Sequence, residues 1–142
     1  MKAVTFSYDD GVTQDIRLVE ILNRYNLKAT FNLNSELLGK DGSLDILGKR
    51  ILHNKIQPHE ITEVYKGHEI AAHTLTHPDM TEMPADEVIR QVEQDRLNLS
   101  ELSGTEVIGM AYPGRQPNYN SRIARIIKNG TGVKYARTTI CN

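Results

Sequence analysis

Two acidic residues stand side by side near the N-terminus, and two histidines stand four positions apart further along the chain. Asp9 and Asp10 follow the apolar run "VTFSY", and Gly11 comes directly after them. His73 and His77 frame the segment "HTLTH". Neutral imidazoles together with a carboxylate form a ligand set for Zn²⁺ or another divalent transition metal. The two segments therefore indicate a metal site, provided that the fold brings them together.

The adjacent aspartates also pose an electrostatic problem. Two carboxylates this close repel each other, and each loses hydration on burial, so we expect a cation nearby. Neighbouring residues of a strand point to opposite faces, but Gly11 allows the backbone to leave the strand at this point. We expect one aspartate to bind the ion with His73 and His77, and the other to lie where it can take a proton from water.

Each motif has a structural interpretation as well. The two histidines alone are compatible with packing, and the aspartates alone are compatible with an Asx turn or a helix N-cap before "GVTQD". Pro78 disfavours a helix that continues through His77, so the histidines are expected on a single turn. The metal interpretation gains weight because both motifs fall at the ends of predicted strands.

The elements that must position these residues alternate along the chain. Apolar and β-branched patterns predict strands over residues 2–8, 28–34, 68–74, 106–113 and 133–139. Helical spacing of apolar residues predicts helices over residues 13–27, 58–65, 83–104 and 121–130. We expect Gly104 to end the third helix and Ser121 to cap the fourth. Residues 35–55 hold three glycines and are expected to form a loop with one helical turn.

This alternation predicts parallel strands joined by right-handed crossovers, in a single α/β domain over residues 1–142. In such folds the functional residues gather where the strands end. Both motifs are therefore expected at one edge of the sheet.

Composition excludes several classes of protein. The formal net charge of -1 gives no electrostatic footprint for nucleic acid or an anionic membrane, and we find no apolar run long enough for a transmembrane helix. Cys141 is the only cysteine, which excludes an internal disulfide. We expect no signal peptide, because the N-terminus passes directly into the first strand. The default expectation is a cytoplasmic protein, unless an export signal has been lost.

The motifs resemble those of the polysaccharide deacetylase family (carbohydrate esterase family 4, the NodB-homology domain). The matching segments are "TFSYDDG", "KATFNLN", "GHEIAAH", "HTLTH" and "MAYPG". The resemblance implies a distorted (β/α) barrel. This chain would supply about five of its roughly seven parallel strands and lack the C-terminal part of the barrel.

The resemblance also implies a reaction, the metal-assisted hydrolysis of N- or O-acetyl groups on a carbohydrate. The ion would polarise the acetyl carbonyl and bind the attacking water. Asp9 would be the general base, and Asp10, His73 and His77 would bind the ion. Zn²⁺ is the expected metal, with Co²⁺ and Ni²⁺ as alternatives.

Further site residues follow from the third matching segment. The backbone N–H of Gly114 would stabilise the oxyanion, and Tyr112 and Arg115 would contact the sugar. The family usually has an arginine at the position of Ala111, where it orients the catalytic aspartate. Arg115 or Arg137 would have to replace it, although ordinary surface charge is the simpler expectation for both.

The family's later motifs, which include a tryptophan and a general-acid histidine, are missing, and the chain has no tryptophan. His53 and His59 fall in a polar loop and are expected to be solvated. A second interpretation is therefore a catalytically impaired carbohydrate-binding protein that keeps the metal triad. A third is a non-haem Fe(II) triad, which the alternating pattern argues against. An incomplete barrel also predicts self-association through its exposed edge.

Overall fold

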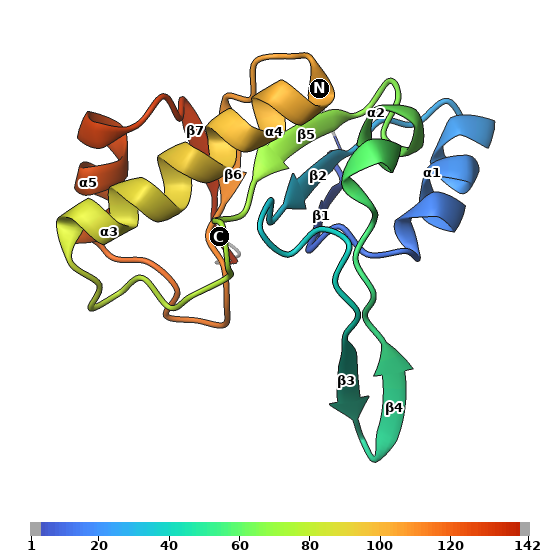
Figure 1. Ribbon diagram of the computed structural model, residues 1–142, viewed down its shortest axis with the longest axis horizontal. Coiled ribbons are helices and arrows are strands. Elements are labelled where there is room, and N and C mark those ends of the chain that lie inside the picture. The colour runs from blue at the N-terminus through green and yellow to red at the C-terminus, as the bar shows by residue number, and fades with distance from the viewer. Residues whose placement is uncertain (1–3, 140–142) are drawn as a thin grey trace.

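A parallel sheet of five strands curls into half a barrel in the computed structural model of the chain, which describes residues 4–139 (Figure 1). The strands lie in the order β1-β2-β5-β6-β7. Their bounds are Ser7–Asp9, Thr30–Leu33, Glu69–Ala72, Gly109–Ala111 and Tyr135–Arg137. All five predicted strands are present but shorter than expected, and residues 2 and 3 of the first lie outside the described residues. The predicted α/β architecture is confirmed.

The register of the sheet decides which residues meet at its edge. Asp9 pairs with Asn32 at the end of β1, and Ala72 at the end of β5 pairs with Met110 of β6. All neighbouring strands of this sheet run parallel, so their carboxyl ends share one edge. The residues that directly follow β1 and β5 therefore come together, as the alternating pattern predicted.

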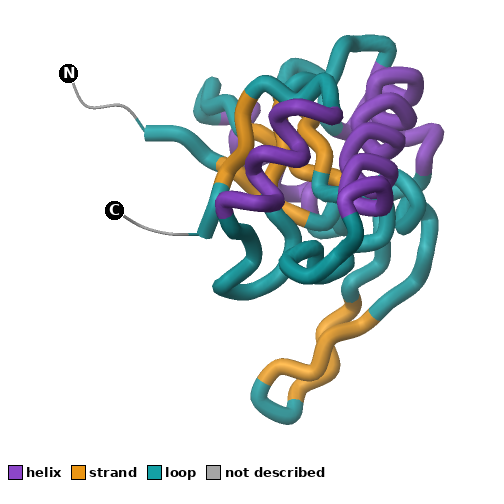
Figure 2. The backbone as a smooth tube through the Cα atoms, turned by 90° about the vertical axis from the view of Figure 1, so that its left-hand side faces the viewer, coloured by secondary structure: helices purple, strands orange, loops and turns teal. Residues whose placement is uncertain are grey.

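Helices line the sheet and join its strands (Figures 1 and 2). Their bounds are α1 Asp15–Arg24, η1 Pro58–Glu60, α2 Ile61–Val64, α3 Ala85–Ile89, η2 Arg90–Gln94, α4 Asp95–Ser103 and α5 Ser121–Gly130. The predicted long helix over residues 83–104 is present, but η2 forms a π-helical turn in its middle. Gly104 ends it in a left-handed conformation, as expected. Among the described helices, none has the length and apolar character needed to cross a bilayer.

The predicted cap of α5 was wrong by one residue. The side chain of Asn120, not Ser121, accepts a hydrogen bond from the backbone N–H of Ile123 at 2.9 Å. Asn120 has an extended backbone, whereas Ser121 is already the first helical residue. The capping oxygen must come from the residue before the helix, because only there can it reach the free N–H groups of the first turn.

The helices pack on the sheet through a continuous apolar core. Phe31 and Leu33 of β2 are fully buried. Val92 and Leu99 from the long helix and Ile123 from α5 are buried in the same core. Burying each such side chain stabilises the fold by about 1.5–3 kcal/mol. This packing makes the sheet edge a rigid platform.

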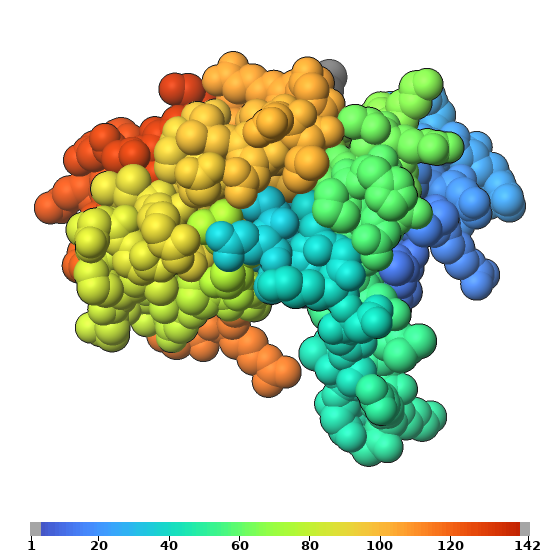
Figure 3. Space-filling model, in the orientation of Figure 1, coloured from blue at the N-terminus to red at the C-terminus, as the bar shows by residue number. Residues whose placement is uncertain are grey.

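The loop predicted over residues 35–55 contains a β-hairpin, so this prediction was wrong for residues 43–52. Strands β3 (Ser43–Ile46) and β4 (Lys49–Leu52) pair only with each other among the described strands. They project from the body of the molecule (Figures 1 and 3). Leu47 and Gly48 turn the chain with φ of +53° and +73°, the combination that suits a two-residue hairpin turn. Leucine in place of the usual Asn or Asp hid this signal.

Candidate metal centre

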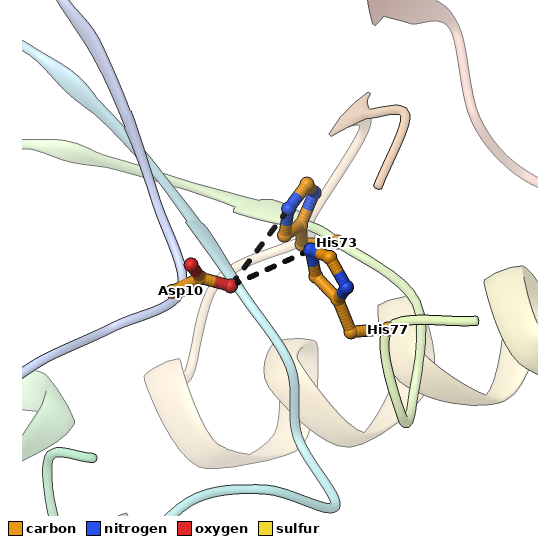
Figure 4. A group of neighbouring side chains, drawn as sticks. All are labelled: Asp10, His73 and His77. Atoms are coloured by element: carbon orange, nitrogen blue, oxygen red, sulfur yellow. Dashed lines mark ion pairs between the residues drawn. The ribbon is translucent and has the colours of Figure 1, made fainter. Parts of the chain in front are cut away.

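Asp10, His73 and His77 converge at the carboxyl edge of the sheet (Figure 4). Asp10 Oδ1 lies 3.7 Å from His77 Nε2 and 4.0 Å from His73 Nε2. One ligand atom from each residue lies within 4.8 Å of the others. A tetrahedral zinc ion with bonds of about 2.0–2.1 Å holds its ligand atoms about 3.3 Å apart. Three groups with the right donor chemistry are therefore spaced slightly wider than a bound ion needs.

The backbone at this edge adopts left-handed conformations that L-residues seldom use. Asp10, Thr74 and His77 have φ of +80°, +69° and +60°. Such strain persists only where the surroundings enforce it, and it is common at functional sites. At Gly11, which also has a positive φ, a Cβ atom would lie 2.8 Å from Leu33 Cδ2. The chain thus leaves β1 abruptly, and the two aspartates point to different neighbours.

The side chain of His73 is oriented by the neighbouring strand. Its Nδ1 lies 2.9 Å from the carbonyl oxygen of Ala111, which can only accept a hydrogen bond. The proton is thereby placed on Nδ1, and the lone pair of Nε2 faces the aspartates. Burial lowers the pKa of His73, although Asp9 and the Ala111 carbonyl oppose this. The imidazole is thus favoured in the neutral form that binds metals.

The turn that carries both histidines is held by the long helix. The backbone N–H of His73 donates to Asp95 Oδ2 at 2.9 Å. The N–H of Leu75 donates to the backbone carbonyl of Gln91 at 3.0 Å, and the N–H of Thr76 donates to the Gln91 side chain at 3.2 Å. Gln91 lies in the π-helical turn η2, and Asp95 follows it directly. The irregular turn of the helix is therefore the part that contacts the candidate site.

Asp9 is fixed beside the three converging residues. Arg137 Nη2 donates to both carboxylate oxygens of Asp9, at 2.6 Å to Oδ2. Asn32 Nδ2 donates to Oδ1 at 2.9 Å, and Oδ2 lies 4.0 Å from His73 Nε2. The expectation that Arg137 is ordinary surface charge was wrong, because the curl of the sheet brings the end of β7 back toward β1. Arg137 is also the register partner of Ala111, the position where the resemblance implies an arginine.

Asp10 has its own set of neighbours from the segment after the hairpin. His53 Nε2 lies 3.3 Å from Asp10 Oδ2, and Lys55 Nζ lies 3.6 Å from Oδ1. The expectation that His53 is solvated was therefore wrong, whereas His59 is exposed as expected. Burial raises the pKa of Asp10, but Lys55 and the three neighbouring histidines outweigh it and lower the pKa below its usual value. Asp10 is thus ionised in neutral solution.

These contacts resolve the electrostatic problem of the adjacent aspartates. Arg137 neutralises Asp9 and Lys55 neutralises Asp10. Positive charge does lie beside the pair, as expected, but the protein supplies it with two cations of its own. The need to balance charge is therefore not by itself an argument for a metal. The converging ligand atoms of Asp10 and the two histidines carry that argument instead.

The remaining predicted site residues lie on the segment that follows β6. Tyr112 is buried and stacks on Tyr119, with ring centroids 5.1 Å apart. Gly114 has φ of +83°, and Gly114 and Arg115 are both exposed. Their contacts with a substrate or an oxyanion stay predictions.

Sequence reasoning missed four residues that support the site. They are Asn32, Lys55, Gln91 and Asp95, all of them buried. A polar residue in the apolar strand "TFNLN" was a usable signal for Asn32. The other three give no local signal, because their partners lie on distant segments.

The amino-acid sequence and the fold both match known proteins. Residues 1–136 match the family model described as polysaccharide deacetylase. The chain is 27% identical over 107 residues to a bifunctional xylanase/deacetylase of Pseudobutyrivibrio xylanivorans, covering 75% of this chain. It is 27% identical over 94 residues to the peptidoglycan-N-acetylglucosamine deacetylase PgdA of Listeria monocytogenes, covering 64% of this chain. It spans only 15% and 17% of these two curated relatives.

A solved structure has the same fold. The Streptococcus pyogenes deacetylase PplD in complex with acetate superposes with a TM-score of 0.70 at 20% identity. The superposition covers 99% of this chain and 66% of the PplD chain. At this identity the likeness supports the fold alone.

Proposed function

This chain belongs to the polysaccharide deacetylase family, and we propose that it is a metal-dependent hydrolase that removes N- or O-acetyl groups from a carbohydrate. The observation that carries the proposal is the convergence of Asp10, His73 and His77 beside the tethered carboxylate of Asp9. The curated relatives it matches are deacetylases by name, one of them acting on peptidoglycan N-acetylglucosamine. An acetylated carbohydrate is accordingly the proposed substrate.

Asp10, His73 and His77 are the residues that would hold the ion. When bound, a divalent ion supplies Lewis acidity that polarises an acetyl carbonyl and lowers the pKa of water. Two imidazoles and one carboxylate suit Zn²⁺, and Co²⁺ and Ni²⁺ accept the same ligands. Asp10 supplies the negative charge of the set, because its pKa is lowered, and His73 supplies a neutral imidazole.

Asp9 is the proposed general base. It accepts a proton from the water that adds to the acetyl carbon, and Arg137 and Asn32 keep its carboxylate oriented for this transfer. Cleavage of the C–N or C–O bond releases acetate, and the proton taken from water is the one that the leaving nitrogen or oxygen needs. The Gly114 N–H is proposed to stabilise the oxyanion, and Tyr112 and Arg115 are proposed to contact the sugar.

The proposal is tested by acetate release from N-acetylglucosamine oligomers and from acetylated xylan, with Zn²⁺, Co²⁺ or Ni²⁺ added. We expect Asp9→Asn to lower the rate by about 100-fold or more, because a positioned base contributes roughly 10²–10⁴-fold. Metal affinity should change little in the same variant. Equal rates in both proteins would remove Asp9 as the base. Sugar affinity and bound metal without turnover would point to a binding protein instead.

A further inference from the structure

The segment that follows the hairpin is bound to the turn that carries Asp10. Residues 54–56 run antiparallel to this turn, with an isolated bridge between Lys55 and Val12. The N–H of Ile56 donates to the carbonyl of Gly11 at 2.9 Å, and the N–H of Thr13 donates to the carbonyl of Asn54 at 2.8 Å. The strained turn at Asp10 is therefore held from the hairpin side.

Lys55 fixes Asp10 through its main chain. The Lys55 side chain is only 9% exposed, and its Nζ donates to the backbone carbonyl of Asp10 at 2.9 Å. This bond restrains the left-handed backbone of Asp10 directly. The same ammonium lies 3.6 Å from Asp10 Oδ1, the oxygen that faces His73 and His77. Any movement of the ammonium further toward Oδ1 would repel a cation bound there.

His53 restrains the ammonium of Lys55. Its Nε2 lies 3.3 Å from Lys55 Nζ. An ammonium group can only donate, so Nε2 accepts this hydrogen bond with its lone pair. Nε2 also lies 3.3 Å from Asp10 Oδ2. His53 thus contacts one carboxylate oxygen of Asp10, whereas the two converging histidines face the other.

We propose that His53 is a positioning residue of the metal centre. It holds Lys55 on the carbonyl of Asp10, and the two residues together present Asp10 Oδ1 to His73 and His77. This inference rests on the proposed function. His53 is not assigned as a ligand, because among the described residues the converging cluster comprises Asp10, His73 and His77.

The first test is a Co²⁺ titration of the full chain, followed by visible absorption and by competition with a chelator. We expect His53→Leu to weaken Co²⁺ binding about 10-fold, the lower end of the effect of disturbing the groups that support a metal ligand, because His53 acts on Asp10 through Lys55. His53→Gln should bind nearly as tightly as the unmodified chain, since its amide oxygen accepts from Lys55. His59→Leu is the matched control, because His59 is exposed, and should leave affinity unchanged.

The second test is a double-mutant cycle with Lys55→Met. If His53 acts by restraining Lys55, His53→Leu should have little effect on Co²⁺ affinity once Lys55 has been replaced. If the effects of His53→Leu and Lys55→Met on Co²⁺ affinity simply add, His53 does not act through Lys55. Urea unfolding of the metal-free variants shows whether each one is folded.

The outcomes separate this inference from the proposed function. If the unmodified chain binds no Co²⁺, the proposed function fails and the inference falls with it. If the unmodified chain binds Co²⁺ and His53→Leu binds it equally well, only the inference fails. If His53→Gln and His53→Leu both lose affinity and His53→Gln changes the Co²⁺ spectrum, His53 is a ligand and the positioning role is overturned.

Discussion

At the scale of single residues, the candidate base is held by side chains from two other strands. Asp9 receives donors from two other strands, Asn32 of β2 and Arg137 of β7. Ala111 stands at the position where the resemblance implies an arginine. Its register partner Arg137 lies on the next strand, β7, and contacts the carboxylate of Asp9 from there. A guanidinium can thus arrive from a neighbouring strand and still contact the base.

The first prediction follows from this contact. Arg137→Met should lower kcat for acetate release about 10-fold or more, because the base loses part of its orientation. Co²⁺ affinity should be retained, since Arg137 contacts none of the three proposed ligands. The kcat of Arg137→Lys should lie between those of Arg137→Met and the unmodified chain. Arg125→Met serves as the control, because Arg125 is exposed. An unchanged kcat in Arg137→Met would exclude the orienting role.

A buried carboxylate lies near the site. Asp15 at the start of α1 is 4% exposed, and its Oδ2 accepts a hydrogen bond from Tyr65 at 2.8 Å. Burial raises the pKa of Asp15 to about 6, although Tyr65 and Lys55 act in the opposite direction. The folded protein therefore holds this proton more tightly than the unfolded chain does.

The second prediction is a pH dependence of stability. The folded pKa of about 6 exceeds the unfolded value of 3.8, so this contribution to stability is complete below about pH 4 and is lost as pH rises through 6. Ionised Asp15 then costs up to about 3 kcal/mol. Asp15→Asn should therefore gain stability relative to the unmodified chain as pH rises from 4.5 to 7.5, measured by urea unfolding. The same pH dependence of stability in both proteins would contradict this prediction.

At the scale of elements, the π-helical turn η2 is the part of the long helix that contacts the candidate metal centre. It places Gln91 and Asp95 against the histidine turn, where they accept hydrogen bonds from its backbone. Asp95 also accepts from the N–H of Ser35 at 2.7 Å, just after β2. One fully buried carboxylate thus joins the ends of β2 and β5 to the helix.

The third prediction concerns this link. Asp95→Ala should lower the free energy of unfolding by about 2 kcal/mol, because the N–H of Ser35 loses this acceptor and the N–H of His73 keeps only the backbone carbonyl of Leu33. Co²⁺ affinity should fall as well, since the backbone of His73 loses its hydrogen bond to the long helix. Gln94→Ala, an exposed change in the same π-helical turn, should alter stability by less than about 0.5 kcal/mol. Matching urea curves for the two variants would refute the link.

At the scale of the whole molecule, the half-barrel has two open edges and a projecting hairpin. β1 and β7 are the outer strands of the described sheet. The hairpin exposes apolar side chains, with Leu44, Ile46 and Ile51 on one face and Leu47 98% exposed at the tip. Figure 3 shows a hollow between this hairpin and the segment that follows β6. Open edges and exposed apolar side chains both favour association.

The fourth prediction is that the chain self-associates, as its incomplete barrel suggested. Light scattering should show a mass that rises with protein concentration above that of the 16.0 kDa monomer. Ile46→Lys combined with Leu47→Lys should restore the monomer if the hairpin is the contact, and should leave the mass raised if a sheet edge is. A monomeric mass at every concentration would contradict the prediction.

The sequence by itself determined the order of the helices and of the five parallel strands, and it indicated that one of the two adjacent aspartates would meet His73 and His77. The periodicity of helices and strands depends on residues that are close in sequence. Parallel strands then bring their carboxyl ends to one edge of the sheet. The resemblance to the deacetylase family, and not these two facts, assigned that role to Asp10. The hairpin was not predicted, because its turn has leucine where Asn or Asp is usual.

Only the tertiary structure decided which groups hold Asp9 and Asp10 in place. Arg137 meets Asp9 across a separation of 128 residues, and His53 reaches Asp10 because its segment folds back along the turn after β1. Such contacts depend on the curl of the sheet and on the path of a loop. Both arise from packing of the whole chain, so no local pattern of residues encodes them.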